Sequence, residues 1–458
     1  MDMMESKNVD KCKDKDMDKI GKEFEKDSVV LTILKFSIPS SIASIISLLC
    51  VLTDRYFIGQ VAGRTGMSAI AIVYPYVVLI NGLTFLFSGI GILVGIKLGE
   101  KNRRSAEKYL GVTMYWIFLF GFLLIISLYV FDREFLMILG ATATNLEDAQ
   151  QYTKFIIPSA IFQIILGQVA LLRSIGQPTQ AMLINIYAAV LNIILDYIFV
   201  MRLGYGISGA AFATLISTGV ASSIFLNCII KSDVLKLRYT NMKPDFKILK
   251  EVFKIGSPRL YNQVLQGMAM VATNRSAGIY GGEIATAAVG IISIVRTTIN
   301  TSMQGFSQGT VAITSYYFGA KKYKKLKEVF RIQIIVVTVV TIVLVLLMLI
   351  FSENIVRFFV KNDPELVKEA SFGMRMNLFL MVSTAIFLAC NNFMQSIKLS
   401  ALSTRYFVIR VLFLNIGFIY LFGYLFGLKG VWLAFPISET VSAFFIMRSV
   451  LKRIKKIG

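Results

Sequence analysis

Long apolar runs separated by short polar loops dominate this sequence. Twelve of them are long enough to cross the ~30 Å hydrocarbon core of a bilayer as a helix. The pattern predicts an all-α polytopic membrane protein with twelve transmembrane helices. The runs fall near residues 31–58, 68–96, 109–131, 152–172, 179–201, 206–230, 249–278, 284–318, 328–351, 370–396, 403–426 and 429–450.

Composition agrees with a chain surrounded by lipid. Hydrophobic residues make up 56% and charged residues 16% of the 458 residues. A soluble domain has roughly 45–50% apolar and about 25% charged residues. We therefore expect the lipid bilayer to be the solvent of most of this protein.

The net charge of +21 is carried by loops rather than by a nucleic-acid-binding face. If the spans alternate, four basic segments fall on one side, and the positive-inside rule makes that side cytoplasmic. We expect a multi-pass protein of the cell membrane, with both termini in the cytoplasm and no nucleic-acid partner. The basic segments are Lys97–Lys108, Lys231–Lys247, Lys321–Lys327 and Lys452–Lys456.

The sequence offers no sign of an enzyme or of a bound cofactor. It has no histidine, and its four cysteines include no Cys-x-x-Cys pair. A Gly-x-x-x-x-Gly-Lys-Ser/Thr phosphate loop, which ATP hydrolysis by a P-loop protein would need, is also absent.

The two halves of the chain resemble each other. Thr53-Asp54-Arg55 matches Thr273-Asn274-Arg275 at an offset of 220, and Leu191-Asn192-Ile193 matches Leu414-Asn415-Ile416 at an offset of 223. Six spans separate the copies, so both have the same orientation in the membrane. We expect two six-helix lobes related by a parallel repeat around a central cleft.

The predicted organisation has five parts, and one chain already holds both lobes, so a monomer suffices. The parts are a charged cytoplasmic tail (1–27), an N-terminal six-helix lobe (28–230), a cytoplasmic linker (231–247), a C-terminal six-helix lobe (248–451) and a basic cytoplasmic tail (452–458).

Charged residues within the membrane are costly and therefore indicate function. Asn192 and Asp196 are four residues apart and share a helix face. Counting helical rise along each run places them, Asp54 and Thr214 in the outer half of the first lobe. Two carboxylates, an amide and a hydroxyl suit Na⁺, or the two acids could hold a proton.

The repeat provides an internal comparison for this cation-coupling site. In the second half Asp54 becomes Asn274, Asp196 becomes Ile419 and Thr214 becomes Phe435. The acidic set thus belongs to one lobe, as expected for a single coupling site. The alternative is that Asp54 pairs with Arg55 or caps its run.

Two further residues have open interpretations. Glu439 either binds a cationic substrate or forms an ion pair with Arg296 or Arg410. Pro39, 15 residues before Asp54, removes a backbone hydrogen bond, which predicts either a hinge or a static kink.

Several motifs together resemble the multidrug and toxic compound extrusion (MATE) family, in particular its bacterial Mep-type branch. The resemblance covers nearly the whole chain after residue 30. The motifs are Phe36-Ser37-Ile38-Pro39-Ser40, Thr53-Asp54-Arg55-Tyr56-Phe57-Ile58-Gly59-Gln60, Leu191-Asn192-Ile193-Ile194-Leu195-Asp196, Gly209-Ala210-Ala211-Phe212-Ala213-Thr214 and Gly430-Val431-Trp432-Leu433-Ala434-Phe435-Pro436-Ile437-Ser438.

This resemblance implies a V-shaped antiporter that expels drugs or other organic cations in exchange for H⁺ or Na⁺. It also implies that Asp54, Asn192, Asp196 and Thr214 form the cation site and that Pro39 bends the first helix. A flippase for a lipid or a lipid-linked precursor is the alternative function.

The chain departs from the family pattern beside this site. Many relatives have Asn-Asn where this chain has Val169 and Ala170, and relatives often have Pro where it has Tyr197. We expect Gln168 to replace the missing amide and, with Glu439, to contact substrate.

Overall fold

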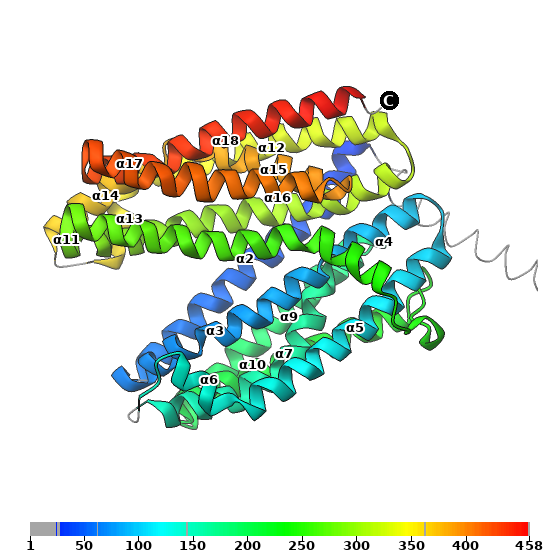
Figure 1. The fold of residues 1–458 in the computed structure, drawn as a ribbon, viewed down its shortest axis with the longest axis horizontal. Coiled ribbons are helices and arrows are strands. Elements are labelled where there is room, and N and C mark those ends of the chain that lie inside the picture. The colour runs from blue at the N-terminus through cyan, green and yellow to red at the C-terminus, as the bar shows by residue number, and fades with distance from the viewer. Residues whose placement is uncertain (1–23, 25–27, 62, 143–144, 361–362, 457–458) are drawn as a thin grey trace, which may run out of the picture. The chain divides into compact units, whose positions relative to one another are not determined.

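The computed structural model describes residues 24, 28–61, 63–142, 145–360 and 363–456, and all regular structure in this part of the chain is helical. Figure 1 follows the helices from blue to red along the chain. They are α2 (Val29–Val61), α3 (Gly63–Phe87), α4 (Gly89–Gly99), α5 (Arg103–Val130), α6 (Asp132–Ile138), α7 (Leu146–Leu166), η1 (Gly167–Val169), α8 (Ala170–Ser174), α9 (Pro178–Asp196), η2 (Tyr197–Arg202), α10 (Gly206–Ile230), η3 (Tyr239–Asn241), α11 (Phe246–Gly319), α12 (Tyr323–Ile350), α13 (Ser352–Phe359), α14 (Pro364–Leu378), α15 (Met381–Ser396), α16 (Ser400–Val408), η4 (Ile409–Asn415), α17 (Ile416–Phe426) and α18 (Leu428–Lys456). Of the predicted N-terminal tail, 1–27, only Phe24 belongs to the described residues. Of the predicted C-terminal tail, 452–458, residues 457 and 458 lie outside them.

The number of membrane spans depends on how α11 is counted. Ten helical segments in the described part are long and apolar enough to cross a membrane, and the bent pair α14 and α15 would be an eleventh. The 74 residues of α11 would rise about 110 Å as one straight helix, far more than a ~30 Å core. Its path is broken at Gly282, where φ is 63° and ψ is −152°. Counted as two arms, α11 brings the total to the predicted twelve.

Side chains that accept hydrogen bonds from free backbone N–H groups mark where several helices begin. Asn102 accepts from the backbone N–H of Ser105 at the start of α5, and Asp363 accepts from that of Leu366 at the start of α14. Such caps satisfy donors that the helix itself leaves unpaired. Pro178 and Pro364 occupy first-turn positions, where a missing N–H costs nothing.

The chain divides into two compact units. Unit 1 comprises residues 1–256 and 315–321, and unit 2 comprises residues 257–314 and 322–458. Apolar side chains from α2, α3, α5, α6, α7 and α10 fill the outer core of unit 1, where Ala69, Ile157 and Ala211 are fully buried. In unit 2 the core gathers around Trp432, whose indole N–H donates to Glu369 at 2.9 Å.

Two glycines at repeat-related positions let backbones meet inside unit 1. A Cβ on Gly99 would lie 2.1 Å from the carbonyl oxygen of Tyr316, and one on Gly319 would lie 2.0 Å from that of Ile96. Lys101 and Lys321, which follow these glycines by two residues, both have φ of 55°. The offset of 220 seen in the sequence therefore also relates two helix ends with the same backbone geometry.

The segment after α10 is held against α5 by a buried acid. Glu107, only 5% exposed, pairs with Arg103 at 3.0 Å and with Arg238 at 3.2 Å. It also accepts a hydrogen bond from the backbone N–H of Lys236. Nearby, the hydrogen bond from Lys108 to Asp245 lowers the pKa of that carboxyl, which also caps α11. The predicted linker thus has fixed partners on unit 1.

Because the Gly99 contacts are with backbone atoms that cannot rotate away, we expect Gly99→Ala and Gly319→Ala each to destabilise the protein by about 1–3 kcal/mol. The check is the thermal unfolding of purified protein in detergent. Gly267→Ala is the control, because no atom lies within 4 Å of a Cβ there, and removing a helical glycine should stabilise by roughly 0.5–1 kcal/mol. Equal stability of all three variants would contradict the close approach.

Candidate cation site in the first unit

Helices α2 and α9 pack against each other, and polar side chains meet at their contact. The thiol of Cys50 on α2 donates to Oδ1 of Asn192 on α9 over 3.0 Å. Each of these residues lies four positions before an aspartate, Asp54 on α2 and Asp196 on α9. Residues four apart share a helix face, so the Cys50–Asn192 contact sets the register of the two aspartates.

Asp196 is completely buried. Within the described residues, neither of its carboxylate oxygens has a hydrogen-bond partner. A carboxylate in this setting costs free energy as an anion, because burial removes water and nothing replaces it. Binding a proton or a cation removes that cost. Asp196 is therefore the residue of the site that gains most from binding such an ion.

Two more groups share the electrostatic environment of Asp196. Asp54, which is half-buried, is close enough to Asp196 for the two carboxylates to repel each other. The buried side chain of Tyr152 on α7 lies within electrostatic range of both carboxylates. Two like charges near each other strengthen the demand for a compensating cation.

The other predicted ligands, Asn192 and Thr214, lie on α9 and α10, which pack against each other. The hydroxyl of Thr214 on α10 donates to the carbonyl of Ala210 in its own helix, over 3.0 Å. The amide nitrogen of Asn192 is buried and has no partner among the described residues. In that same part of the chain, no three Cys, Asp or Glu side chains are arranged to hold a metal. A Na⁺ site with amide and hydroxyl oxygens stays a prediction.

Sequence reasoning missed Cys50 and Tyr152. Cys50 could have been found, since its spacing from Asp54 repeats the spacing of Asn192 and Asp196. Tyr152 carries no such signal, because α7 reaches the site only through packing. The side chain of Arg55, the alternative partner of Asp54, lies outside those that the structure describes.

Two other predicted site residues, Gln168 and Pro39, lie within helical segments, η1 and α2. Gln168 is 1% exposed, and its amide nitrogen donates to the carbonyls of Thr84 and Ile164. It thereby ties α3 to the end of α7, and its Oε1 has no partner in the described part. Pro39 lies inside α2, which continues as a helix on both sides of it. The substrate and hinge roles stay predictions.

The departure at Tyr197 has a visible consequence. The backbone N–H of Tyr197 bonds to the carbonyls of Ile193 and Ile194, and a proline would lack that donor. The chain continues from Asp196 into the π-helical η2. Such turns are rare and often mark functional sites.

Glu439, the third membrane acid, forms an ion pair. Its Oε1 lies 2.7 Å from Nε of Arg410, and both side chains are buried. Of the two arginines considered from the sequence, Arg410 is therefore the direct partner. Contact of Glu439 with substrate stays a prediction.

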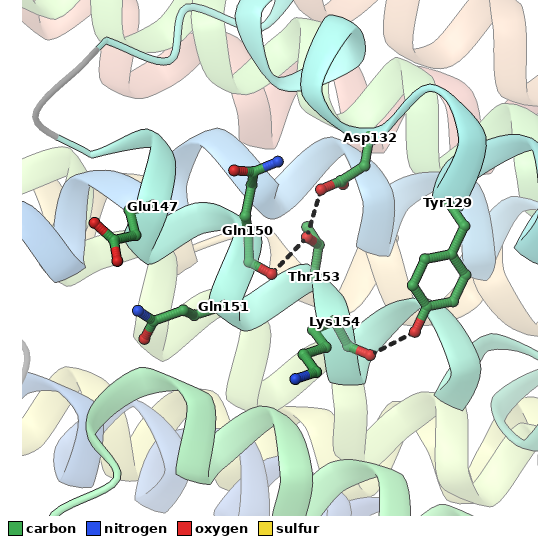
Figure 2. Close-up of a pocket in the computed structure, with 7 residues that line it drawn as sticks. All are labelled: Tyr129, Asp132, Glu147, Gln150, Gln151, Thr153 and Lys154. Carbon is green, nitrogen blue, oxygen red and sulfur yellow. Dashed lines mark hydrogen bonds between the residues drawn. The ribbon is translucent and has the colours of Figure 1, made fainter.

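A shallow pocket lies at the end of unit 1 where α5, α6 and α7 meet (Figure 2). Tyr76 and Thr153 donate to the two oxygens of Asp132 over 2.8 and 3.1 Å. Burial raises the pKa of Asp132, although these bonds oppose the rise. Its contribution to stability is thus present at low pH and lost as the pH rises through the pKa of the folded state. Because both oxygens are occupied, the site joins helices rather than offering a free anion.

The comparison with known sequences decides the family. The MatE profile matches residues 39–198 and 258–421, more than half of the chain. The chain belongs to the MATE family. This confirms the resemblance and the prediction of a transporter rather than an enzyme.

Two curated relatives show how far the likeness extends. A protein named multidrug export protein MepA, from Staphylococcus saprophyticus, is 28% identical over 435 residues, covering 93% of this MATE chain and 94% of the relative. Another of that name, from Staphylococcus aureus, is 28% identical over 429 residues, covering 93% and 94%.

Solved structures confirm the fold at lower identity. A MATE crystal structure in complex with MaL6 matches with a TM-score of 0.90 at 22% identity, over 95% of this chain and 98% of that one. An outward-facing multidrug resistance MATE transporter of the MOP superfamily matches at 0.89 and 22%, over 94% and 97%. A MOP superfamily transporter from Pyrococcus furiosus matches at 0.88 and 22%, over 95% and 98%. The all-α, multi-pass architecture is confirmed.

The two buried acids of this MATE chain should respond oppositely to neutralisation. At alkaline pH, where the carboxyl is ionised, we expect Asp196→Asn to stabilise the protein by about 1–3 kcal/mol, because it removes a buried charge without a partner. Glu439→Gln should destabilise it by roughly 3–5 kcal/mol, because it leaves Arg410 uncompensated. Thermal unfolding in detergent at alkaline pH measures both. A loss of stability in Asp196→Asn as large as that in Glu439→Gln would show that Asp196 has a stabilising partner.

Proposed function

We propose that this MATE chain is a cation-coupled antiporter of the cell membrane that exports cationic amphipathic drugs or other toxic organic compounds by alternating access. Its relatives over 93% of the chain are named as multidrug export proteins. The family and the fold support a transporter, and the acidic set in unit 1 supports a positively charged cargo. The coupling residues of this proposal are Asp54, Asn192, Asp196 and Thr214.

The observation that carries the proposal is the state of Asp196. This carboxyl is fully buried, has no hydrogen-bond partner among the described residues and faces the charge of Asp54. A structural carboxylate in a membrane span is expected to be paired, as Glu439 is with Arg410. An acid that lacks such a partner gains one whenever a proton, a metal cation or an organic cation enters.

Coupling then follows from competition for the same negative charge. A proton or Na⁺ that binds at Asp54 and Asp196 removes the attraction for a cationic solute, so binding of one favours release of the other. This coupling is reciprocal, because each ligand changes the affinity for the other by the same factor. Release of drug outward and entry of the ion from outside are the two halves of one cycle.

One contact favours a proton over Na⁺ as the coupling ion. Oδ1 of Asn192 already accepts from Cys50. Na⁺ would need neutral oxygens such as this one as ligands in addition to the carboxylates. A proton needs only one carboxylate oxygen, and both oxygens of Asp196 are without a partner in the described part.

The remaining parts of the proposal concern topology and motion. By the positive-inside rule, the basic loops support a cytoplasmic location of both termini. Pro39 serves as the point at which α2 bends during the cycle, since its ring removes one backbone hydrogen bond of the helix. One chain contains both units and acts as a monomer.

The test is ethidium transport by purified protein in liposomes, with a pH gradient and a Na⁺ gradient imposed separately. We expect the pH gradient to drive transport, and Asp196→Asn and Asp54→Asn to reduce it by roughly tenfold or more. Glu134→Gln is the matched control, because Glu134 is exposed on α6 and should transport like the wild type.

The outcomes separate the competing functions. Transport driven by Na⁺ alone would keep the antiporter and replace the proton. Undiminished transport by both aspartate variants, correctly inserted, would refute the coupling site. Gradient-independent movement of a fluorescent phospholipid, with no movement of ethidium, would establish the flippase instead.

A further inference from the structure

One aromatic side chain near the start of the chain is buried in unit 1. Phe24 is the only aromatic residue among the first 27, of which nine are acidic and seven are lysines. Its side chain is nevertheless completely buried. Burial of apolar surface is the main source of free energy for such a contact, and a charged segment has little else to offer. Phe24 therefore marks a specific attachment of this segment.

The ring of Phe24 stacks against two other aromatic rings. The centroid of Phe36 on α2 lies 5.0 Å away with planes at 27°, and that of Tyr316 on α11 lies 4.5 Å away with planes at 12°. The buried Tyr317 donates its hydroxyl hydrogen to the backbone carbonyl of Phe24. All four residues belong to unit 1. We call the site that Phe36 and Tyr316 form for this ring the aromatic slot.

Tyr316 is a fixed wall of the aromatic slot. Its carbonyl oxygen is the atom against which Gly99 of α4 packs, and Gly319 packs against the carbonyl of Ile96 in return. Because these contacts join backbone to backbone, the end of α11 cannot shift without α4. A ring that stacks on Tyr316 is therefore attached to a rigid part of unit 1.

Phe36 is a wall of the aromatic slot on α2, three residues before Pro39. Beyond Pro39, the hydrogen bond from Cys50 to Asn192 ties α2 to α9. The helix is thus attached to unit 1 on both sides of the residue whose ring removes a backbone hydrogen bond. A bend at Pro39 moves one side of α2 relative to the other, so one of the two attachments has to give way.

The repeat indicates that the aromatic slot is an addition to the shared framework. At the offset of 220, Phe36 corresponds to Gly256 and Tyr316 to Ile96, and neither counterpart is aromatic. Gly256 instead meets α3 directly, since a Cβ there would lie 2.1 Å from the carbonyl oxygen of Leu86. The first part of α11 is therefore held through its backbone, whereas the slot on α2 is filled by a side chain that can leave it.

We propose that Phe24 is a latch for the predicted cytoplasmic end of α2. Seated in the aromatic slot, it holds the part of α2 before Pro39 against the end of α11, and it leaves the slot when α2 bends during transport. The described contacts of Phe24, two ring stacks and one hydrogen bond, can break without separating packed helices. This inference rests on the proposed export function and adds the contact that controls the bend.

Locking the aromatic slot tests the latch on the full-length protein in liposomes. Phe36→Cys and Tyr316→Cys are combined and joined by a reducible bis-methanethiosulfonate reagent, which fixes α2 to the end of α11. We expect the cross-link to slow ethidium transport under a pH gradient by about tenfold or more, because α2 can then no longer bend. Reduction of the reagent should restore transport. Either replacement alone, treated with the same reagent, should keep its untreated rate.

Removing the latch should have the opposite effect. Phe24→Ala leaves the aromatic slot unfilled, so we expect transport to be about threefold faster than in the wild type and thermal unfolding to begin at a lower temperature. Phe24→Leu fills part of the slot without a ring and should give intermediate values. Phe122→Ala is the matched control, because that ring is 55% exposed on α5, and it should transport like the wild type.

The outcomes separate the latch from the export function. Equal transport by the cross-linked and the reduced protein overturns the latch and leaves export intact. Lower stability of Phe24→Ala with an unchanged or slower transport rate also overturns it, and identifies Phe24 as a static anchor. Absence of ethidium transport by the wild type under either gradient counts against both proposals.

Discussion

A charge inside a bilayer has to be compensated, and this requirement organises the polar interior of the protein. Glu439 and Arg410 compensate each other at 2.7 Å. Arg296 lies over an aromatic ring, which offers partial compensation. Asp196 has no hydrogen-bond partner within the described residues. Because an uncompensated charge at the centre of a span costs about 2.5–3.5 kcal/mol or more, the degree of compensation separates structural charges from those available to a ligand.

Close backbone contact is the second constraint, since lipid offers no hydrophobic force that pushes helices together. Gly99 and Gly319 meet the facing backbone where any Cβ would collide. The same geometry recurs two residues later, in the left-handed conformations of Lys101 and Lys321. These repeat-related features fix the framework at the helix ends, far along the spans from Asp196 and Arg296. The two units can therefore share a framework and differ in the charges that they carry.

Run length made the spans predictable, because only helices of that length satisfy the backbone in lipid. The gap predicted between 278 and 284 coincides with the break at Gly282. Burial and a spacing of four residues also indicated Asn192 and Asp196 as one face. The choice of Arg410 over Arg296 as the partner of Glu439 was not accessible, because it depends on how α11, η4 and α18 rotate against one another. The same limit hid Tyr152, whose helix reaches the acidic pair only through tertiary packing.

Two charged residues buried in the spans, Asp196 and Arg410, are associated with π-helical turns. Asp196 is the residue immediately before η2, and Arg410 is the second residue of η4. A π turn accommodates one more residue than an α turn, so the side chains beyond it point in a shifted direction. This wider turn is less stable than the α-helix, and it persists where the surrounding packing requires that direction. Asp196 lies just before such a turn, and within η4 the guanidinium of Arg410 lies over two phenylalanine rings and pairs with Glu439. In both units, then, the backbone departs from the α-helix next to a charge that is buried within a span.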